Sequence, residues 1–506
     1  MLGDVTGTPP TGRSGATLGE RAAIALVFGT SAAVLVVELV ALRLLAPYLG
    51  LTLETSTLVI GIALAAIAAG SWLGGRAADR FAPRLLLAPA IGVSGAAVAL
   101  TPFVVRLVGV AAPGLLVLVS ALSILVPGAL LAAVTPIVTK LRLTTLEETG
   151  TVVGRLSGIS TAGAIVGTVV TGFVLISAVP VSVILVGLGV VLLATAVVLA
   201  GWLGGWARGG QALAAGAVVI GGLGSLAVGS GCDVETTYHC AIVVEDPDLA
   251  SGRTLVLDGL RHSYVDLADP THLEFSYVKA VASAIDARLP GADPRTTHHL
   301  GAGGVTIPRW LAQTRPGTSS TVSEIDQGVV DLDRRALGLE TGGDTGIEVR
   351  VEDGRLGLRE LADDSQDLVV GDAFGGVSVP WHLTTVEALA QIERVLAGDG
   401  TYVVNIIDNP PMAFARAELA TMQRVFADVA LLAPPATLSL LDGGNVVAVA
   451  SADGPLDIPA LQASLDEREV GWTAVGGTEL ESFIGDSPVL TDDYAPVDQL
   501  LTPYGR

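Results

Sequence analysis

Charged side chains are scarce in this sequence. Asp, Glu, Lys and Arg make up 15% of its 506 residues, against about 25% in an ordinary soluble protein. The shortage lies mainly before position 230. Most of the 50 acidic residues follow that position, and the half of the chain before it has a slight excess of basic residues. The acidic half lacks the basic surface that phosphates require, so we expect no nucleic-acid partner. Its charge would suit a small cationic amine, although acidic residues also serve solubility alone.

Cysteine is almost absent as well. Cys232 and Cys240 are the only two, and they bracket the start of the acidic half. With one adjacent histidine, His239, they cannot fill the four ligand positions of a structural zinc site, so we expect no metal. The alternatives are two free thiols or a disulfide, and a disulfide requires an oxidising compartment. We expect the disulfide between Cys232 and Cys240.

Long apolar runs fill the first half. A spanning helix needs about 20 mostly apolar residues, and seven runs meet this criterion: 22–46, 56–75, 85–105, 112–138, 157–178, 181–203 and 211–229. Gly and Ala are dense in these runs, and small residues let helices approach closely in lipid. We therefore predict a polytopic α-helical membrane domain of about seven helices over residues 21–230, in contact with the lipid bilayer of the cell membrane.

The positions of Lys and Arg predict the orientation of these spans. Basic residues cluster before the first run and after the second, fourth and sixth: Arg13, Arg21, Arg76, Arg80, Arg84, Lys140, Arg142, Arg155 and Arg208. These positions predict a cytoplasmic N-terminal segment over residues 1–20. That segment is polar, and the run after it is too long for a cleavable signal peptide, so we expect the run to remain as the first membrane helix. Seven spans then place the acidic half outside the cell, and an even number would reverse this.

Short apolar strands alternate with helices in the acidic half. We expect strands near 254–259, 298–300, 320–326, 347–353, 368–372 and 401–407, with helices near 273–289, 304–311 and 384–396. This alternation predicts a parallel, doubly wound, Rossmann-like α/β domain over residues 271–506, after a β-rich connecting segment over 231–270. Such sheets bind ligands at the carboxyl ends of their strands.

Candidate binding residues lie at these strand ends. Gly301 and Gly303 follow one strand, where the missing side chains let the backbone turn and approach a ligand. Glu324 ends the next strand, where a carboxylate can accept both ribose hydroxyls. Asp353 ends the third, placed for an adenine amine, and Asp372 ends the fourth, facing the reacting group. Surface acids at ordinary turns would need no ligand, but the order favours a nucleoside site of the S-adenosylmethionine methyltransferase type.

Short motifs along this half resemble those of spermidine synthases in order and approximate spacing. They are Leu257-Asp258-Gly259, Glu274-Phe275-Ser276-Tyr277, the Gly301 loop, Ser323-Glu324-Ile325-Asp326, Glu352-Asp353-Gly354 and Gly371-Asp372. The resemblance spans about residues 235–430. Residues 70–80 resemble the loop between the second and third helices of major-facilitator transporters. The apolar half, especially residues 154–180, and the ending 490–497 look like the membrane-fused spermidine synthase-like proteins.

This resemblance implies an activity and roles for the site residues. The activity is transfer of an aminopropyl group from decarboxylated S-adenosylmethionine, a cosubstrate and not a permanently bound cofactor, to an amine such as putrescine. Glu324 would hold the ribose and Asp353 the adenine, while Tyr277 and His262 would line the amine pocket. Asp372 would be the catalytic carboxylate. Oligomeric state is left open, with a homodimer as one alternative.

The resemblance is incomplete around the amine. Gly375 replaces a second family aspartate that helps to activate the attacking nitrogen, and Gly304 replaces an aspartate of the glycine-rich loop. His262 stands in place of a pocket glutamine, and Val278 in place of a histidine. An amine must lose a proton to attack, so these losses would be costly.

Two interpretations therefore stand side by side. The first is a membrane-anchored spermidine synthase-like enzyme with altered acceptor chemistry, in which Asp258 or the pair Asp492 and Asp493 could replace the missing carboxylates. The second is a non-catalytic ligand-binding or transport-associated membrane protein that reuses the fold, since fold alone does not establish function.

Overall fold

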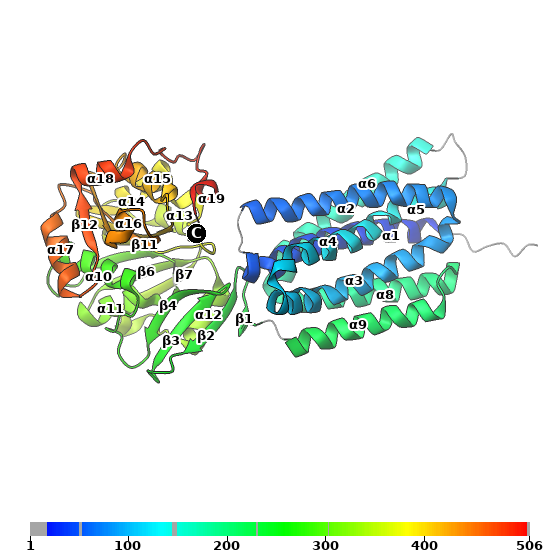
Figure 1. Cartoon of the computed structure of the whole chain (residues 1–506), viewed down its shortest axis with the longest axis horizontal. Helices are drawn as coiled ribbons and strands as arrows, with labels where there is room; N and C mark the ends of the chain where they lie inside the picture. Colours follow the sequence, from blue (N-terminus) through cyan, green and yellow to red (C-terminus); the bar gives the residue numbers. More distant parts are fainter. Residues whose placement is uncertain (1–17, 50–52, 144–148, 229–230, 302, 503–506) are drawn as a thin grey trace, which may run out of the picture. The chain divides into compact units, whose positions relative to one another are not determined.

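The chain folds into two compact units (Figure 1). The computed structural model describes residues 18–49, 53–143, 149–228, 231–301 and 303–502. One unit comprises residues 1–45 and 56–230, and the other comprises 46–55 and 231–506. The expected N-terminal segment lies outside the described residues up to position 17, and so does Arg13.

The helical unit contains seven helical spans, among the residues described, that are long and apolar enough to cross a membrane. The predicted number is therefore confirmed by length and composition. Its elements are α1 (Glu20–Leu49), α2 (Leu53–Arg80), α3 (Pro83–Ala111), η1 (Pro113–Leu115), α4 (Leu116–Ala132), α5 (Val134–Arg142), α6 (Thr149–Val170), η2 (Thr171–Leu175), α7 (Ile176–Ala178), α8 (Val181–Leu203) and α9 (Arg208–Val228). The fourth span combines η1, α4 and α5, and the fifth combines α6, η2 and α7.

Small residues bring these helices into close contact, as their density predicts. A Cβ atom on Gly163 of α6 would lie 2.3 Å from the carbonyl oxygen of Phe28 on α1. Beside it, the hydroxyl oxygens of Ser160 and Ser31 lie 2.7 Å apart. The two backbones can approach this closely only because position 163 has no side chain.

The second unit begins with an antiparallel meander. Its strands pair in the order β1 (Val234–Glu235), β2 (Cys240–Glu245), β3 (Gly252–Leu257) and β4 (Leu260–Asp266). Apolar residues on one face of this small sheet pack against α12 (Gln327–Ala336) of the larger α/β fold. This packing fixes the small sheet against the end of the large one.

The large sheet has eight described strands in the order β12-β10-β11-β9-β8-β5-β6-β7. They are β5 (Thr296–Leu300), β6 (Ser319–Glu324), β7 (Ile347–Val351), β8 (Gln366–Gly371), β9 (Leu396–Asp408), β10 (Asp428–Ala433), β11 (Gly444–Ser451) and β12 (Thr473–Gly476). Strands β5 to β9 pair in parallel. The expected doubly wound, methyltransferase-like α/β fold is therefore confirmed.

The expectation that the whole sheet is parallel is wrong. Strand β11 pairs antiparallel with both β9 and β10, and β12 pairs antiparallel with β10. Residues 434–443, which connect β10 to β11, contain only the short α16 (Pro435–Leu438). A parallel crossover needs about a dozen residues or more, so this connection must reverse the chain direction.

Helices cover both faces of the large sheet. Helices α14 (Val386–Val395), α15 (Ala413–Met422) and α18 (Gly477–Ile484) pack on one face. Helices α10 (Ser276–Arg288), α11 (Thr306–Thr314) and α17 (Ile458–Glu467) pack on the other. Successive residues along each strand point alternately toward the two helix layers, because side chains of a β-strand alternate between its faces.

The remaining elements are η3 (Gly303–Val305), η4 (Gly343–Thr345), α13 (Gly354–Glu360), η5 (Trp381–Leu383) and α19 (Val497–Leu500).

Candidate functional site

A cavity of about 1050 Å³ opens at the carboxyl ends of β5, β6 and β8. All seven predicted site residues line it: His262, Tyr277, Gly301, Gly303, Glu324, Asp353 and Asp372. They come from β4, α10 and the turns after four parallel strands. The fold thus brings together residues that are more than a hundred positions apart in the sequence.

The glycine-rich turn after β5 runs along the cavity. Gly301 has a φ of 96°, and a Cβ atom there would lie 2.5 Å from the carbonyl oxygen of Asp372. Its N–H donates to the carbonyl of Ser323 at 2.9 Å. Gly303 has open space around its Cα. Position 301 therefore requires glycine for the fold itself, whereas Gly303 leaves room for a ligand.

Glu324 and Asp353 project from the ends of β6 and β7. Glu324 Oε1 accepts from the backbone N–H of Asp326 at 2.8 Å. Asp353 Oδ1 accepts from the N–H groups of Arg355 and Leu356, which makes it the N-cap of α13. Asp353 thus has a structural role beside any contact with a ligand.

Asp372 lies on the cavity floor between two hydrogen-bond donors. Tyr277 Oη donates to Asp372 Oδ2 at 3.2 Å, and Asn405 Nδ2 donates to Asp372 Oδ1 at 2.8 Å. Burial raises the pKa of Asp372 to about 6, and the two hydrogen bonds oppose that rise. Asp372 is therefore mostly ionised at pH 7 and can exchange a proton in the neutral range.

The cavity is acidic. Burial raises the pKa of the Tyr238 phenol, and the nearby carboxylates of Asp326, Asp353 and Glu324 raise it further. Burial also raises the pKa of Tyr277 well above its ordinary value, helped by Asp372. A site with this field attracts cations and repels anions.

The two glycines that depart from the spermidine synthase pattern differ in their surroundings. A Cβ atom on Gly375 would meet only the carbonyl oxygen of Ser378, at 3.9 Å. Gly304 has a φ of 72°, and its Cβ would lie 2.4 Å from Ser263 Oγ. An aspartate could therefore be accommodated at position 375, but not at position 304 without rearrangement.

The carboxylates considered as replacements have other partners. Asp492 makes a two-pronged ion pair with Arg355, at 2.7 Å for each oxygen, and accepts from Thr385. It belongs to the wall that supports α13, outside the cavity lining. Asp258 pairs with His239, which does line the cavity. Asp258 therefore contacts a lining side chain directly, whereas Asp492 is linked to the lining residues Asp353 and His382 through Arg355.

Three residues that line the cavity were not predicted from the sequence as site residues. His382 Nε2 lies 2.9 Å from Asp353 Oδ2, and Asn405 joins Asp372 to Asn445. A polar residue inside the apolar run of β9 was a signal for Asn405. His239 was noted only as a neighbour of the cysteines. No local sequence pattern predicts His382 as a site residue, because only the tertiary fold brings its loop to the cavity.

The histidines before the glycine-rich turn are buried in the sheet. His298 Nε2 contacts Ser323 Oγ at 3.2 Å, and His299 Nε2 contacts Thr297 Oγ1 at 2.9 Å. Burial lowers the pKa of His298 to about 4 and that of His299 to about 3. Among the residues described, no group of three or more His, Cys, Asp or Glu is arranged to hold a metal ion.

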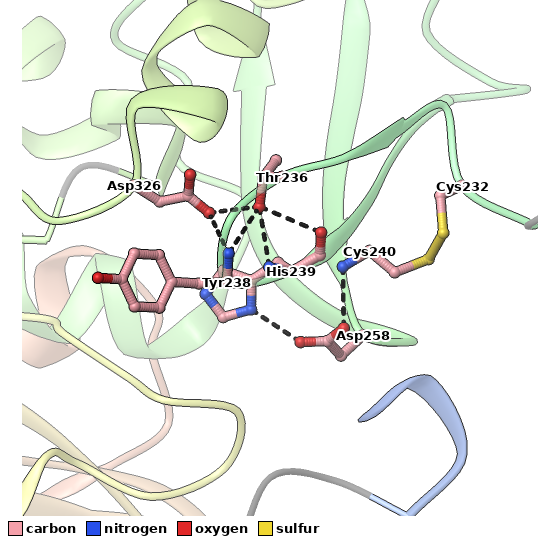
Figure 2. Close-up of polar contacts among 7 residues, drawn as sticks. All are labelled: Cys232, Thr236, Tyr238, His239, Cys240, Asp258 and Asp326. Atoms are coloured by element: carbon pink, nitrogen blue, oxygen red, sulfur yellow. Dashed lines mark hydrogen bonds and ion pairs between the residues drawn. A yellow bond between two sulfur atoms is a disulfide. The ribbon is translucent and has the colours of Figure 1, made fainter. Parts of the chain in front are cut away.

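A disulfide closes the loop before β2. It joins Cys232 to Cys240, whose Cα atoms are 5.3 Å apart (Figure 2). Thr236, Tyr238 and His239 lie within the loop that it closes. The structure thus contains the disulfide form of the two states that the sequence allows.

Comparison with curated proteins identifies relatives for part of the chain. No family profile matches it. It is 26% identical over 199 residues to the polyamine aminopropyltransferase of Vibrio vulnificus, across 38% of this chain and 64% of the relative. It is 27% identical over 219 residues to a probable polyamine aminopropyl transferase of Bifidobacterium longum, across 40% and 48%. The matches thus span less than two thirds of these relatives, and they confirm the expected resemblance to spermidine synthases.

Solved structures of similar proteins include two spermidine synthases. A probable spermidine synthase from Corynebacterium glutamicum is 26% identical and has a TM-score of 0.48, over 52% of this chain and 97% of its own. The spermidine synthase of Thermotoga maritima is 20% identical and has a TM-score of 0.34, over 43% and 70%.

Proposed function

We propose that this chain is a membrane-anchored aminopropyltransferase. It transfers an aminopropyl group from decarboxylated S-adenosylmethionine to a polyamine acceptor such as putrescine. The single observation that carries the proposal is the cavity in which Glu324, Asp353 and Asp372 meet at consecutive strand ends. The relatives named as polyamine aminopropyltransferases supply the reaction class.

Different residues of the cavity bind the two substrates. Glu324 and Asp353 accept hydrogen bonds from the ribose and the adenine, and the turn at Gly301 and Gly303 lets the backbone approach the nucleoside. Tyr277 and Asp372 hold the acceptor amine. Both the sulfonium donor and the acceptor are cations, so the acidic field favours each of them over neutral analogues.

Asp372 also prepares the nucleophile. An ammonium group must lose a proton before its nitrogen lone pair can attack carbon. A carboxylate with a pKa of about 6 is ionised at neutral pH and can receive that proton. The hydrogen bonds from Tyr277 and Asn405 hold it in place. The nitrogen then attacks the propyl carbon as the carbon–sulfur bond breaks, and the electron pair of that bond stays on sulfur.

Turnover tests the proposal directly. The purified full chain in detergent, supplied with decarboxylated S-adenosylmethionine, should release methylthioadenosine in the presence of putrescine, cadaverine, spermidine or agmatine. An Asp372→Asn variant should lose this activity. Binding of methylthioadenosine without turnover of any of the four amines would instead support a non-catalytic ligand-binding module. The glycine at position 375 is the observation that favours that second function.

We infer that the seven apolar helices anchor the protein in the membrane. Their length and composition match the requirement for spanning a bilayer. The positions of Lys and Arg and the Cys232–Cys240 disulfide support a soluble unit outside the cytoplasm. Extraction of the chain from membranes by alkaline carbonate would contradict the anchor.

A further inference from the structure

The cavity offers a second proton acceptor on a different element from Asp372. His239, in the loop between β1 and β2, lines the cavity together with Asp372. Its Nδ1 lies 2.7 Å from Asp258 Oδ2, in the turn after β3. The side chains are 10% and 7% exposed, so water competes little for this contact. Figure 2 shows the pair beside the disulfide.

The dyad is held rigidly from several sides. Asp258 Oδ1 accepts from the N–H of Cys240 at 2.9 Å, which fixes the carboxylate. Thr236 Oγ1 accepts from the N–H of His239 at 2.8 Å and donates to Asp326. Asp326 also accepts from Tyr238 N–H and caps α12. The disulfide closes the same loop, so His239 is positioned before any ligand binds (Figure 2).

The chemistry of this contact fixes the state of the ring. An ionised Asp258 accepts a hydrogen bond, so the neutral imidazole carries its proton on Nδ1 and its lone pair on Nε2. A carboxylate behind a histidine in this way also stabilises the imidazolium that forms on protonation. The pair has the features of a general base.

We propose that His239, oriented by Asp258, is a second catalytic base of the aminopropyl transfer, in place of the carboxylate that is missing at Gly375. The inference rests on the proposed function. The acceptor ammonium loses a single proton, for which His239 Nε2 is the alternative acceptor to Asp372, and the ring becomes an imidazolium when it takes that proton. The freed amine attacks the propyl carbon, the carbon–sulfur bond breaks, and neutral methylthioadenosine leaves. The new secondary amine carries the positive charge, and His239 returns its proton to solvent.

The groups that face His239 suit this role. His262 on β4 is its closest ring neighbour, at 6.3 Å between centroids. Burial and the charge of His239 lower the pKa of His262 to about 4, and Asp258 opposes the shift. His262 therefore stays neutral while His239 gains and loses its proton. The charged groups on this side are Asp258, which contacts His239, Asp326, which accepts from Thr236, and, among the lining residues, Arg261, Glu274, Glu324 and Asp353.

His262 adds a polar contact for the acceptor. Its Nε2 is buried and has no hydrogen-bond partner among the residues described. Its backbone carbonyl accepts from Tyr277 Oη, which in turn donates to Asp372. Tyr277 thus links the backbone of His262, the ring neighbour of His239, to Asp372, and both proposed bases line the same cavity.

The test compares full-chain variants across a pH series. His239→Gln keeps a polar side chain without a base, and Asp258→Asn removes the orienting charge. His272→Gln serves as the matched control, because His272 lies outside the cavity lining and its side chain is 37% exposed. With decarboxylated S-adenosylmethionine and putrescine, kcat should fall about 10² to 10⁴-fold in His239→Gln. Affinity for methylthioadenosine, measured by calorimetry, should change little, and the control should match the wild type.

The pH profile separates a base from a structural residue. In the wild type, the rise of kcat between pH 5 and 8 should follow two ionisations, and in His239→Gln it should follow one, that of Asp372. A His239→Gln variant with the wild-type kcat and profile would overturn the dyad and leave the proposed function intact. An inactive wild type that binds methylthioadenosine would overturn both. Loss of methylthioadenosine binding in the variant would assign His239 to nucleoside binding and also overturn its role as base.

Discussion

At the scale of single residues, the site combines carboxylates that have structural partners with an acidic field for cations. Asp353 caps α13 and contacts His382, while Glu324 accepts from the N–H of Asp326. Alanine at either position would remove these contacts together with any contact to a ligand. The amide variants Glu324→Gln and Asp353→Asn keep an acceptor oxygen for the backbone and remove only the charge.

Glu324→Gln and Asp353→Asn should each weaken methylthioadenosine binding while the chain stays folded. A hydrogen bond to a charged group contributes about 1.5–3 kcal/mol, so the expected loss is roughly 10 to 100-fold in affinity. Calorimetry on the full chain measures it. Glu467→Gln, on the exposed end of α17, is the control and should bind as the wild type does. Unchanged affinity in both site variants would remove the nucleoside from the cavity.

Gly375→Asp should increase kcat toward putrescine, because position 375 has room for a side chain and lies between Phe374 and Gly376, which line the cavity. The gain should be largest, about tenfold or more, in a His239→Gln background where a base is missing. Gly375→Asn is the matched control with the same size and no charge. Equal rates for the Asp and Asn variants would show that the carboxylate does not matter.

At the scale of elements, α12 connects the small sheet to the glycine-rich turn. Asp333 on this helix is fully buried, and its Oδ2 accepts from Gly304 N–H at 3.2 Å. Burial raises the pKa of Asp333 to about 8, and Glu324 adds to the rise. Between about pH 4 and pH 8, Asp333 therefore keeps its proton in the folded state, whereas the unfolded chain releases it above the ordinary Asp pKa of about 4. Stability from this group is present at low pH and declines as the pH rises toward 8.

Asp333→Asn should stabilise the chain, and more strongly at pH 8 than at pH 5. The amide keeps its acceptor oxygen for Gly304 and has no proton to lose. Each unit of pKa difference corresponds to about 1.4 kcal/mol, so a gain above about 1 kcal/mol is expected at pH 8. Thermal unfolding in detergent at the two pH values measures it. Asp331→Asn, an exposed neighbour on α12, should show no such difference, and a lower Tm for Asp333→Asn at pH 8 would contradict the argument.

At the scale of the whole molecule, the side of the membrane on which the soluble unit lies affects its function. From the charge distribution and an odd number of spans, we propose that this unit lies outside the cell. Adenosyl cosubstrates are cytoplasmic, so an outside location would require a supply of substrate there. The disulfide in the structure agrees with an oxidising compartment.

Labelling of the cysteines decides between the two locations. A membrane-impermeant thiol reagent should label Cys232 and Cys240 on intact cells only after reduction, because they are joined outside. A variant with both cysteines replaced by serine is the control for background. Thiols that are shielded in intact cells and react without reductant after lysis would place the soluble unit inside.

The sequence alone determined the local and periodic features. Apolar run length specified seven long apolar helices, and the alternation of strands and helices specified the α/β fold. Glu324, Asp353 and Asp372 could be located because each lies at the end of a predicted strand. These features depend on short stretches of chain, so composition and spacing are sufficient to read them.

Only the tertiary structure decided which distant residues meet. The reversal of β11 depends on where a short connection lies in the sheet. The pairing of His239 with Asp258, and of His382 with Asp353, depends on separate loops arriving at one cavity. The role of Asp333 depends on burial, which has no local sequence signal for an acidic residue. Each is set by packing between segments that are remote in sequence, so no spacing rule along the chain could reveal it.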